Sequence, residues 1–274
     1  MRRITRLLNW LRTTKKIPIE YIVDNREYFK KKTVLVLGGT GGIGFEIASA
    51  FADAGANVII SGSNNRTVED KVLLLKKKFA DSIKGCVIDL NEPETFSEKI
   101  LFCSELFGTI DIFINSAGVH TENVDFWKIS EAEFERVINI NLKSSFFIVR
   151  EIGKYMISNK IKGDIIMVSS SRGYEPAWSP YGISKWGLEG FVKGAAKIFL
   201  PYGIAVNCIA PGTTATKLIG FEEGSSIESE ENTLGRIILP GEVAQLVKCI
   251  VGRGGVISGE TIRVSAGRGV FDIR

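Results

Sequence analysis

Residues 33–54 read TVLVLGGTGGIGFEIASAFADA and carry three patterns in direct succession. Residues 33–37 are a continuous apolar run, which is typical of a strand buried on both faces of a sheet. Glycines follow at once, and from Ile43 onward the apolar residues take the spacing of a helix. The stretch therefore predicts a strand, a tight glycine turn and a helix, the opening unit of a parallel α/β sheet.

The alternation of strand and helix continues along the chain. Further strands are predicted at residues 57–61, 85–90, 110–115, 164–169, 205–209 and 261–264, with helices at 71–79, 131–159 and 181–200. This order indicates a doubly wound α/β fold with a seven-stranded parallel sheet. With no obvious linker after the first strand, we expect one domain over residues 33–274, preceded by an extension over residues 1–32.

The composition excludes several classes of protein. Of 274 residues, 45% are hydrophobic and 24% charged, which is ordinary for a globular chain and excludes disorder for most of it. No apolar run reaches the ~20 residues that a membrane helix needs. One histidine and four well-separated cysteines without a CxxC pair give no metal site. The cysteines lie mostly in apolar segments, so we expect buried free thiols and a cytoplasmic location.

The net charge of +4 hides an asymmetry along the chain. Residues 1–32 hold ten basic and three acidic residues, whereas the remainder is net acidic. Ile4, Leu7, Leu8 and Leu11 follow the spacing of one helix face. Residues 1–16 are therefore predicted to form a basic amphipathic helix. Two roles stay open for it: peripheral contact with an anionic membrane or a partner, and packing against the protein's own body.

The glycine turn predicts a nucleotide site. Glycine permits a close backbone approach, and the unpaired N–H groups at a helix N-terminus favour a phosphate. The residues expected at this site are Gly38, Thr40, Gly42, Ile43 and Gly44.

The end of the second predicted strand indicates which dinucleotide binds. An Asp or Glu about 20 residues after the glycines holds the ribose of NAD, but here the sequence offers Ser63, Asn64 and Arg66. Small polar donors and an arginine suit a 2′-phosphate, so NADP(H) is favoured over NAD(H). After the third strand, Asp89 is expected to accept from the adenine amino group and Leu90 to cover the ring.

Tyr181 and Lys185 form a YxxxK pair. On a helix, positions i and i+4 share a face, so the phenol and the ammonium are expected to lie side by side. The positive charge favours the phenolate, which makes tyrosine a useful proton donor and acceptor.

Several further motifs stand in order around this pair. They are NSAG at 115–118, Asn141, SSS at 169–171, and Pro211-Gly212 followed by Thr216. Together with the glycine turn, they closely resemble the short-chain dehydrogenase/reductase family over about residues 33–268. The resemblance implies a Rossmann-type fold and an NAD(P)-dependent oxidoreductase. It also implies a homodimer or homotetramer whose subunits meet through helices 143–159 and 181–200.

The resemblance implies a role for each matching residue. Tyr181 would be the general acid in reduction and the base in oxidation, and Lys185 would assist it and hold the nicotinamide ribose. Ser170, chosen among three serines because Gly173 follows, would hydrogen-bond the substrate carbonyl. Asn141 would hold a water that relays protons to Lys185. Further cofactor contacts are implied for Asn115, Ala117, Gly118, Pro211, Gly212, Thr214 and Thr216.

Three departures from the family pattern concern Leu37, Ser116 and the pocket wall. Leu37 stands where the family has Thr, and Ser116 replaces the second Asn of NNAG. The segment between Ser170 and Tyr181 is about two residues shorter than usual, which alters the wall of the substrate pocket.

The substrate is only loosely indicated. His120, Arg172 and Trp178 are candidate substrate contacts, and residues 217–239 form an acidic segment beside the expected site. The chain resembles 3-oxoacyl-[acyl-carrier-protein] reductases, but a sugar, polyol or other small carbonyl stays open. We therefore expect hydride transfer between NADP(H) and a carbonyl or secondary alcohol, with no nucleic acid involved. The alternative is a non-catalytic, nucleotide-binding redox sensor or scaffold that docks through the basic extension.

Overall fold

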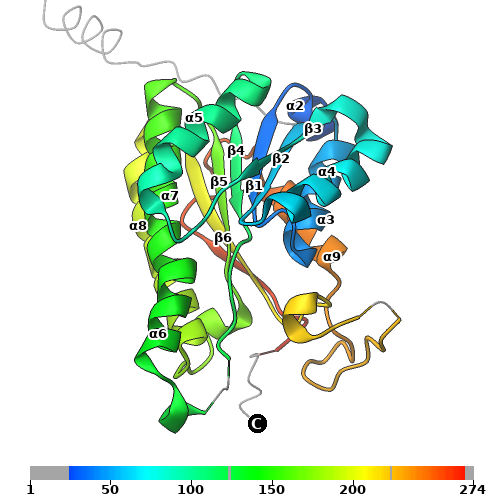
Figure 1. Ribbon diagram of the computed structural model, residues 1–274, viewed down its shortest axis with the longest axis vertical. Helices are drawn as coiled ribbons and strands as arrows, with labels where there is room; N and C mark the ends of the chain where they lie inside the picture. The colour runs from blue at the N-terminus through cyan, green and yellow to red at the C-terminus, as the bar shows by residue number, and fades with distance from the viewer. Residues whose placement is uncertain (1–24, 123–124, 223, 269–274) are drawn as a thin grey trace, which may run out of the picture.

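The computed structural model describes residues 25–122, 125–222 and 224–268 of the chain. Seven parallel strands form one sheet in the order β3-β2-β1-β4-β5-β6-β7, with helices on both faces (Figure 1). The predicted doubly wound, seven-stranded Rossmann-type sheet is confirmed.

Each strand lies within about three residues of its prediction, with the largest difference at the end of β3. The strands are β1 (Thr33–Leu37), β2 (Asn57–Gly62), β3 (Ile83–Val87), β4 (Ile112–Asn115), β5 (Asp164–Val168), β6 (Ala205–Pro211) and β7 (Thr261–Val264). The helices are α2 (Asn25–Phe29), α3 (Gly42–Asp53), α4 (Asn65–Phe79), α5 (Phe96–Phe107), α6 (Glu131–Ile138), α7 (Ser144–Ser158), α8 (Pro180–Phe199) and α9 (Pro240–Ile250). The sequence analysis did not predict α2, α5 or α9.

Strand β1 contributes to two separate cores. Its side chains alternate, so that Val34 and Val36 pack into one hydrophobic cluster with α3 and α9, while Leu35 and Leu37 pack into another with α5, α7 and α8. A central strand of this kind has no polar face. This explains why residues 33–37 are apolar without interruption.

The crossover of the sheet positions the site. Strand β1 pairs with β2 on one side and with β4 on the other, and Leu37 is opposite both Ser61 and Asn115. The chain leaves these strands toward opposite faces, which opens a crevice beyond their carboxyl ends. The loops that carry the glycines, Ser63 and the NSAG residues all meet at this crevice.

The described part of the N-terminal stretch packs on the body. Phe29 is fully buried and meets Phe51 edge to face, with ring centroids 5.0 Å apart. The basic amphipathic helix predicted over residues 1–16 lies outside the described residues. Among those described, no helix is both long and apolar enough to cross a membrane.

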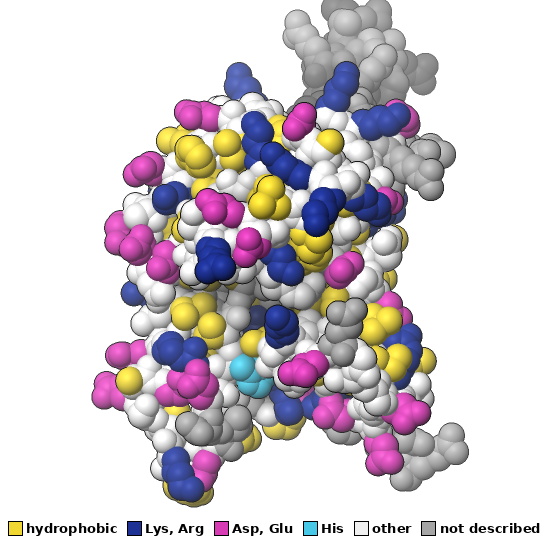
Figure 2. Space-filling model, turned by 45° about the vertical axis from the view of Figure 1, so that its right-hand side comes forward, with side chains coloured by type: hydrophobic (Ala, Val, Ile, Leu, Met, Phe, Trp, Pro, Cys, Tyr) yellow, Lys and Arg dark blue, Asp and Glu magenta, His cyan; other side chains and the backbone are white. Residues whose placement is uncertain are grey.

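The cysteines follow the sequence prediction with one difference. Cys86, Cys103 and Cys208 are buried and free, whereas Cys249 is exposed on α9. Within the described residues, no group of three or more His, Cys, Asp or Glu could hold a metal ion. Figure 2 shows acidic and basic side chains interspersed over this face, with several basic ones gathered in its upper half.

Candidate active site

The glycine turn packs too tightly for any side chain at two of its positions. A Cβ at Gly44 would lie 2.3 Å from the Gly38 carbonyl oxygen. One at Gly38, whose φ is +72°, would lie 2.6 Å from the backbone nitrogen of Ala117. This packing brings the N-terminus of α3 against the loop after β4, so its N–H groups face the crevice as a bound pyrophosphate requires.

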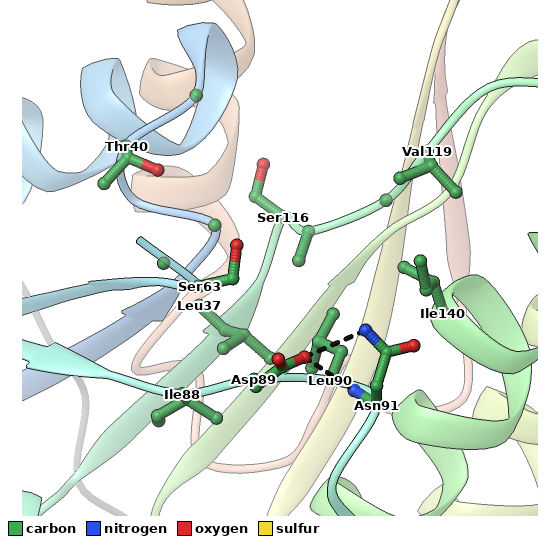
Figure 3. Close-up of a pocket in the computed structure, with 15 residues that line it drawn as sticks. Leu37, Thr40, Ser63, Ile88, Asp89, Leu90, Asn91, Ser116, Val119 and Ile140 are labelled. Carbon is green, nitrogen blue, oxygen red and sulfur yellow. Dashed lines mark hydrogen bonds between the residues drawn. The ribbon is translucent and has the colours of Figure 1, made fainter. Parts of the chain in front are cut away.

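A cavity of about 270 Å³ lies on one side of this turn (Figure 3). The predicted residues that line it are Gly38, Thr40, Ser63, Asp89, Leu90, Ala117 and Gly118. Asp89 also stabilises its own loop, because Oδ1 accepts hydrogen bonds from the backbone and side-chain nitrogens of Asn91 at 2.9 and 3.0 Å. Asn91 and Ile140 line the cavity as well and were not predicted from the sequence.

Asn64 and Arg66 lie differently from Ser63. The Asn64 side chain caps α4 by accepting from the backbone nitrogen of Thr67 at 3.0 Å. Arg66 is exposed in the first turn of α4 and does not line this cavity. Lys71, one turn further along α4, lines the neighbouring cavity beside Gly41 and Gly42. It is a basic residue at the cofactor crevice that the motif spacing did not reveal.

Two larger cavities, of about 430 and 670 Å³, meet at Tyr181. Tyr181 and Lys185 are both nearly buried on α8, and Lys185 Nζ lies 5.5 Å from the centre of the Tyr181 ring. Lys185 Nζ donates to the Val168 carbonyl at 3.0 Å, and Thr121 Oγ1 accepts from the backbone nitrogen of Tyr181. The pair lies side by side, as its i, i+4 spacing predicts.

Asn141 lies in a local π-helical turn. The expected continuous helix over residues 131–159 is wrong in this respect, because Asn139–Lys143 is wound as a π-helix between α6 and α7. Asn141 Oδ1 accepts from the Val119 nitrogen at 2.8 Å, and Nδ2 donates to the Val119 carbonyl and to Ser184 Oγ. The extra residue in the turn aims the side chain inward, as π-bulges at functional sites often do.

The three serines after β5 have different surroundings. Ser169 Oγ donates to Glu189 at 2.9 Å, and burial raises the pKa of that glutamate while this hydrogen bond opposes the shift. Ser171 is buried, whereas Ser170 is partly exposed at the start of a 3₁₀ turn, where its Oγ accepts from the backbone nitrogen of Arg172. All three line the cavity of about 430 Å³, and Ser170 is the one whose hydroxyl is both accessible and not committed to another side chain.

His120 stacks on Tyr181, with ring centroids 4.2 Å apart and an interplanar angle of 23°. Partial burial of the imidazole lowers the pKa of His120, and the positive charges of Arg172 and Lys185 add to this effect. These effects favour the neutral imidazole, which lines the cavity together with Ser170. Trp178, the third candidate substrate contact, does not line this cavity; it is half-exposed and meets Phe126 edge to face.

The remaining predicted residues line the cavities or support the strands and loops around them. Asn115 is buried, donates to Ser145 Oγ at 3.0 Å and accepts from the Ala117 nitrogen, so it links β4 to α7. Thr214 Oγ1 donates to the Gly212 carbonyl at 2.8 Å. Residues from the loop after β6 that line the cavity of about 430 Å³ are Pro211, Gly212, Thr214 and Thr216.

A cluster of charged and polar side chains borders the same cavity. We call it the Arg268 cluster; it consists of Arg172, Glu175, Thr213, Glu231 and Arg268. Arg268 Nε lies 2.6 Å from Glu175 Oε1, and Nη1 lies 2.5 Å from Glu231 Oε2. The hydrogen bond with Glu175 raises the pKa of the Arg268 guanidinium. The members of this cluster are up to 96 residues apart in the sequence, so no local motif reveals that they pair, although Arg172 and the acidic segment that contains Glu231 were expected near the site.

The acidic segment is tied to α9 as well as to the Arg268 cluster. Arg236 donates to both carboxylate oxygens of Glu242 at 2.7 and 2.8 Å, and this pairing holds the pKa of Glu242 at about 2. Arg236 thus fixes the segment to the N-terminus of α9.

Comparison with known proteins gives consistent results. A model of the short chain dehydrogenase family matches residues 32–223. An L-rhamnose 1-dehydrogenase (NADP(+)) of Thermoplasma acidophilum is 33% identical over 224 residues, which cover 78% of this chain and 87% of that protein. A 3-oxoacyl-[acyl-carrier-protein] reductase of Chlamydia trachomatis is 32% identical over 241 residues, with 86% and 96% covered. A solved structure of ElxO with NADP bound superposes with a TM-score of 0.78 at 26% identity, covering 86% of this chain and 97% of that one.

Proposed function

The chain belongs to the short chain dehydrogenase family, and on this premise we propose that it transfers a hydride between NADP(H) and a carbonyl or secondary alcohol substrate. The observation that carries the proposal is the nearly buried Tyr181–Lys185 pair: both residues line the cavity of about 670 Å³, and Tyr181 also lines the cavity of about 430 Å³ together with Ser170. The glycine turn fits a dinucleotide, because its backbone N–H groups face the crevice and a Cβ at Gly38 or Gly44 would collide with backbone atoms.

The residues act on the substrate oxygen and its proton. In reduction, Tyr181 donates its phenolic proton to the carbonyl oxygen, and the ammonium of Lys185 stabilises the phenolate that remains. Ser170 hydrogen-bonds the same oxygen as negative charge develops there. Asn141 fixes the backbone at Val119 and orders the proton path to Lys185. Bound NADPH supplies the hydride, and in the reverse direction Tyr181 is the base.

The preference for NADP(H) is supported by the absence of an acid at the end of β2. Ser63 faces the cavity beside Thr40, and no carboxylate follows until Glu69. Titration with each cofactor, followed by fluorescence, is expected to show NADPH binding about tenfold or more tighter than NADH. Ser63→Asp should reverse the preference, since its carboxylate repels a 2′-phosphate and accepts from ribose hydroxyls.

The exposed Ser97 in the first turn of α5 provides the matched control. Ser97→Asp adds the same charge far from the glycine turn and should leave both affinities unchanged. Equal binding of NADPH and NADH to the wild type would contradict the assignment. Turnover with a panel of carbonyl compounds and the preferred cofactor then tests the reaction itself.

We also propose a cytoplasmic homo-oligomer that forms through α7 and α8. The support is apolar surface on these helices: Phe146 and Trp186 are each about half exposed, and Phe146 stacks at an angle on Phe191. Phe146→Asp is expected to reduce the molecular mass measured by light scattering to that of a monomer or of a smaller assembly. Leu73→Asp, on the exposed face of α4, is the matched control and should not change the mass. The proposal fails if the Phe146 variant keeps the wild-type mass.

A further inference from the structure

The structure points to a class of substrate for the proposed reaction. We infer that the substrate is a small, uncharged, polyhydroxylated carbonyl or polyol whose hydroxyl groups are held by the Arg268 cluster. The inference rests on the proposed function, because it places the substrate between this cluster and Tyr181. It excludes a long acyl thioester as the preferred substrate.

The position of the cluster is the first support. Arg172, Glu231 and Arg268 line the same cavity of about 430 Å³ as Tyr181, Ser170 and His120. A substrate whose carbonyl meets Tyr181 and Ser170 therefore extends toward charged groups. Such groups give a long apolar chain no favourable surface, because a chain packed there would remove water from them without replacing its hydrogen bonds.

The second support is the hydrogen-bonding capacity of the cluster. Arg268 Nε, Nη1 and Nη2 make four hydrogen bonds to Glu175, Glu231 and Thr213. A guanidinium carries five N–H donors, so one donor on Nη2 is left over within the described residues. Both hydrogen bonds to Glu231 use Oε2, which leaves Oε1 as an acceptor there. Adjacent donors and acceptors are what a hydroxyl group, which does both, can satisfy.

The third support is the balance of charge. Arg172 is paired with Glu175, and Arg268 with both Glu175 and Glu231, so two guanidinium groups face two carboxylates. No positive charge in the cluster is left to attract an anionic substrate. His120 adds hydrogen-bonding nitrogens to the same cavity, and partial burial, which lowers its pKa, disfavours a positive charge on it. The cluster thus matches a neutral polar molecule better than a keto acid.

The fourth support is the acidic segment at the cavity. Besides Glu231, the segment exposes Glu222, Glu228 and Glu230. An acidic carrier protein or a coenzyme A phosphate approaching this side is repelled rather than steered in. A neutral molecule experiences no such barrier.

The substrate panel is the first experiment. With NADP⁺, we would measure oxidation of C5 and C6 aldoses and polyols; with NADPH, we would measure reduction of acetoacetyl-CoA, pyruvate and 2,3-butanedione. The best sugar or polyol is expected to exceed acetoacetyl-CoA and pyruvate in kcat/KM by about tenfold or more, since charged hydrogen bonds to one hydroxyl contribute that much.

Substitutions then test the cluster itself. Arg268→Ala should raise KM for the best sugar about tenfold or more, with a smaller change for 2,3-butanedione, which has no hydroxyl to hold. Removing the contacted hydroxyl from the sugar should cost the wild type a similar factor and the Arg268 variant nothing further. Glu231→Gln should lower the activity with sugars, and Glu230→Gln, the neighbouring exposed carboxylate, is its matched control. NADPH affinity checks that each variant is folded.

The outcomes separate this inference from the function on which it rests. A preference for acetoacetyl-CoA or pyruvate overturns the substrate class and leaves the oxidoreductase in place. An equal loss for sugar and butanedione in the Arg268 variant assigns the cluster a structural role and also overturns it. If NADPH binds but no compound is turned over, the proposed function fails, and the substrate class fails with it.

Discussion

Tyr181→Phe is expected to remove nearly all turnover while NADPH binds as tightly as before. The change deletes one oxygen, the group that gives or takes the proton, and leaves the ring that stacks on His120. General acid–base catalysis of this kind contributes about 10²- to 10⁴-fold, so we expect kcat to fall by about 10³-fold. The measurement is single-turnover kinetics at saturating NADPH, with cofactor affinity determined separately.

A second tyrosine supplies the control for this experiment. Tyr202 lies exposed just after α8, and Tyr202→Phe removes the same atom far from the cavities. It should leave both kcat and NADPH affinity unchanged. If Tyr181→Phe kept more than about a tenth of the wild-type rate, another group would be the acid. Weaker NADPH binding with an unchanged rate would assign Tyr181 to the cofactor alone.

Gly44→Ala should abolish measurable NADPH binding and lower the melting temperature. The new Cβ would lie 2.3 Å from the oxygen and 2.8 Å from the carbon of the Gly38 carbonyl. Both are backbone atoms, so no flexible side chain can yield, and the turn itself must shift. Overpacking of this kind costs about 1–3 kcal/mol. Displacement of the N–H groups that face the phosphate should raise the Kd about 100-fold or more, as the loss of two charge-assisted hydrogen bonds would.

The control for Gly44 is a glycine with space around it. Gly194 lies in the exposed part of α8, and a Cβ there would meet nothing within 4 Å. Gly194→Ala should raise stability by about 0.5–1 kcal/mol, because alanine is the better helix former, and should leave the NADPH affinity unchanged. Calorimetry together with cofactor titration measures both variants. If Gly44→Ala bound NADPH as tightly as the wild type, the assignment of the pyrophosphate site to this turn would be wrong.

Most of the fold could be predicted because each strand is short, apolar and bounded by polar or glycine residues. Residues 261–264 were predicted as the structure has them, as β7. Helix α5 was missed because Leu101 and Phe102 are exposed next to the buried Ile100 and Cys103, which blurs the helical period. Helix α9 did carry a signal, since Pro240 opens it and Val243, Val247 and Ile250 follow at helical spacing.

Parts of the site that depend on residues close in sequence could also be predicted, whereas contacts between residues distant in sequence could not. The glycine turn and the Tyr181–Lys185 pair depend on neighbours in sequence, so a motif captures them. The π-helical turn at Asn141 adds one residue to a helical pattern, and nothing in the residue types marks it. The stack of His120 on Tyr181 and the Arg268 cluster join residues that only the folded sheet brings together. No local sequence motif predicts such contacts.

The division of β1 between two cores has a consequence for how the sheet finds its alignment. In a strand with one polar face, a slip by one residue would put polar side chains into the core. In β1 such a slip only exchanges valines with leucines, so hydrophobicity alone penalises misalignment weakly. Polar contacts at the start of β1 favour the correct register. Asp111 Oδ2 accepts from the Thr33 nitrogen at 3.0 Å, and its Oδ1 binds Lys32. The carboxylate of Asp111, directly before β4, thus helps to fix the register of β1 in the sheet.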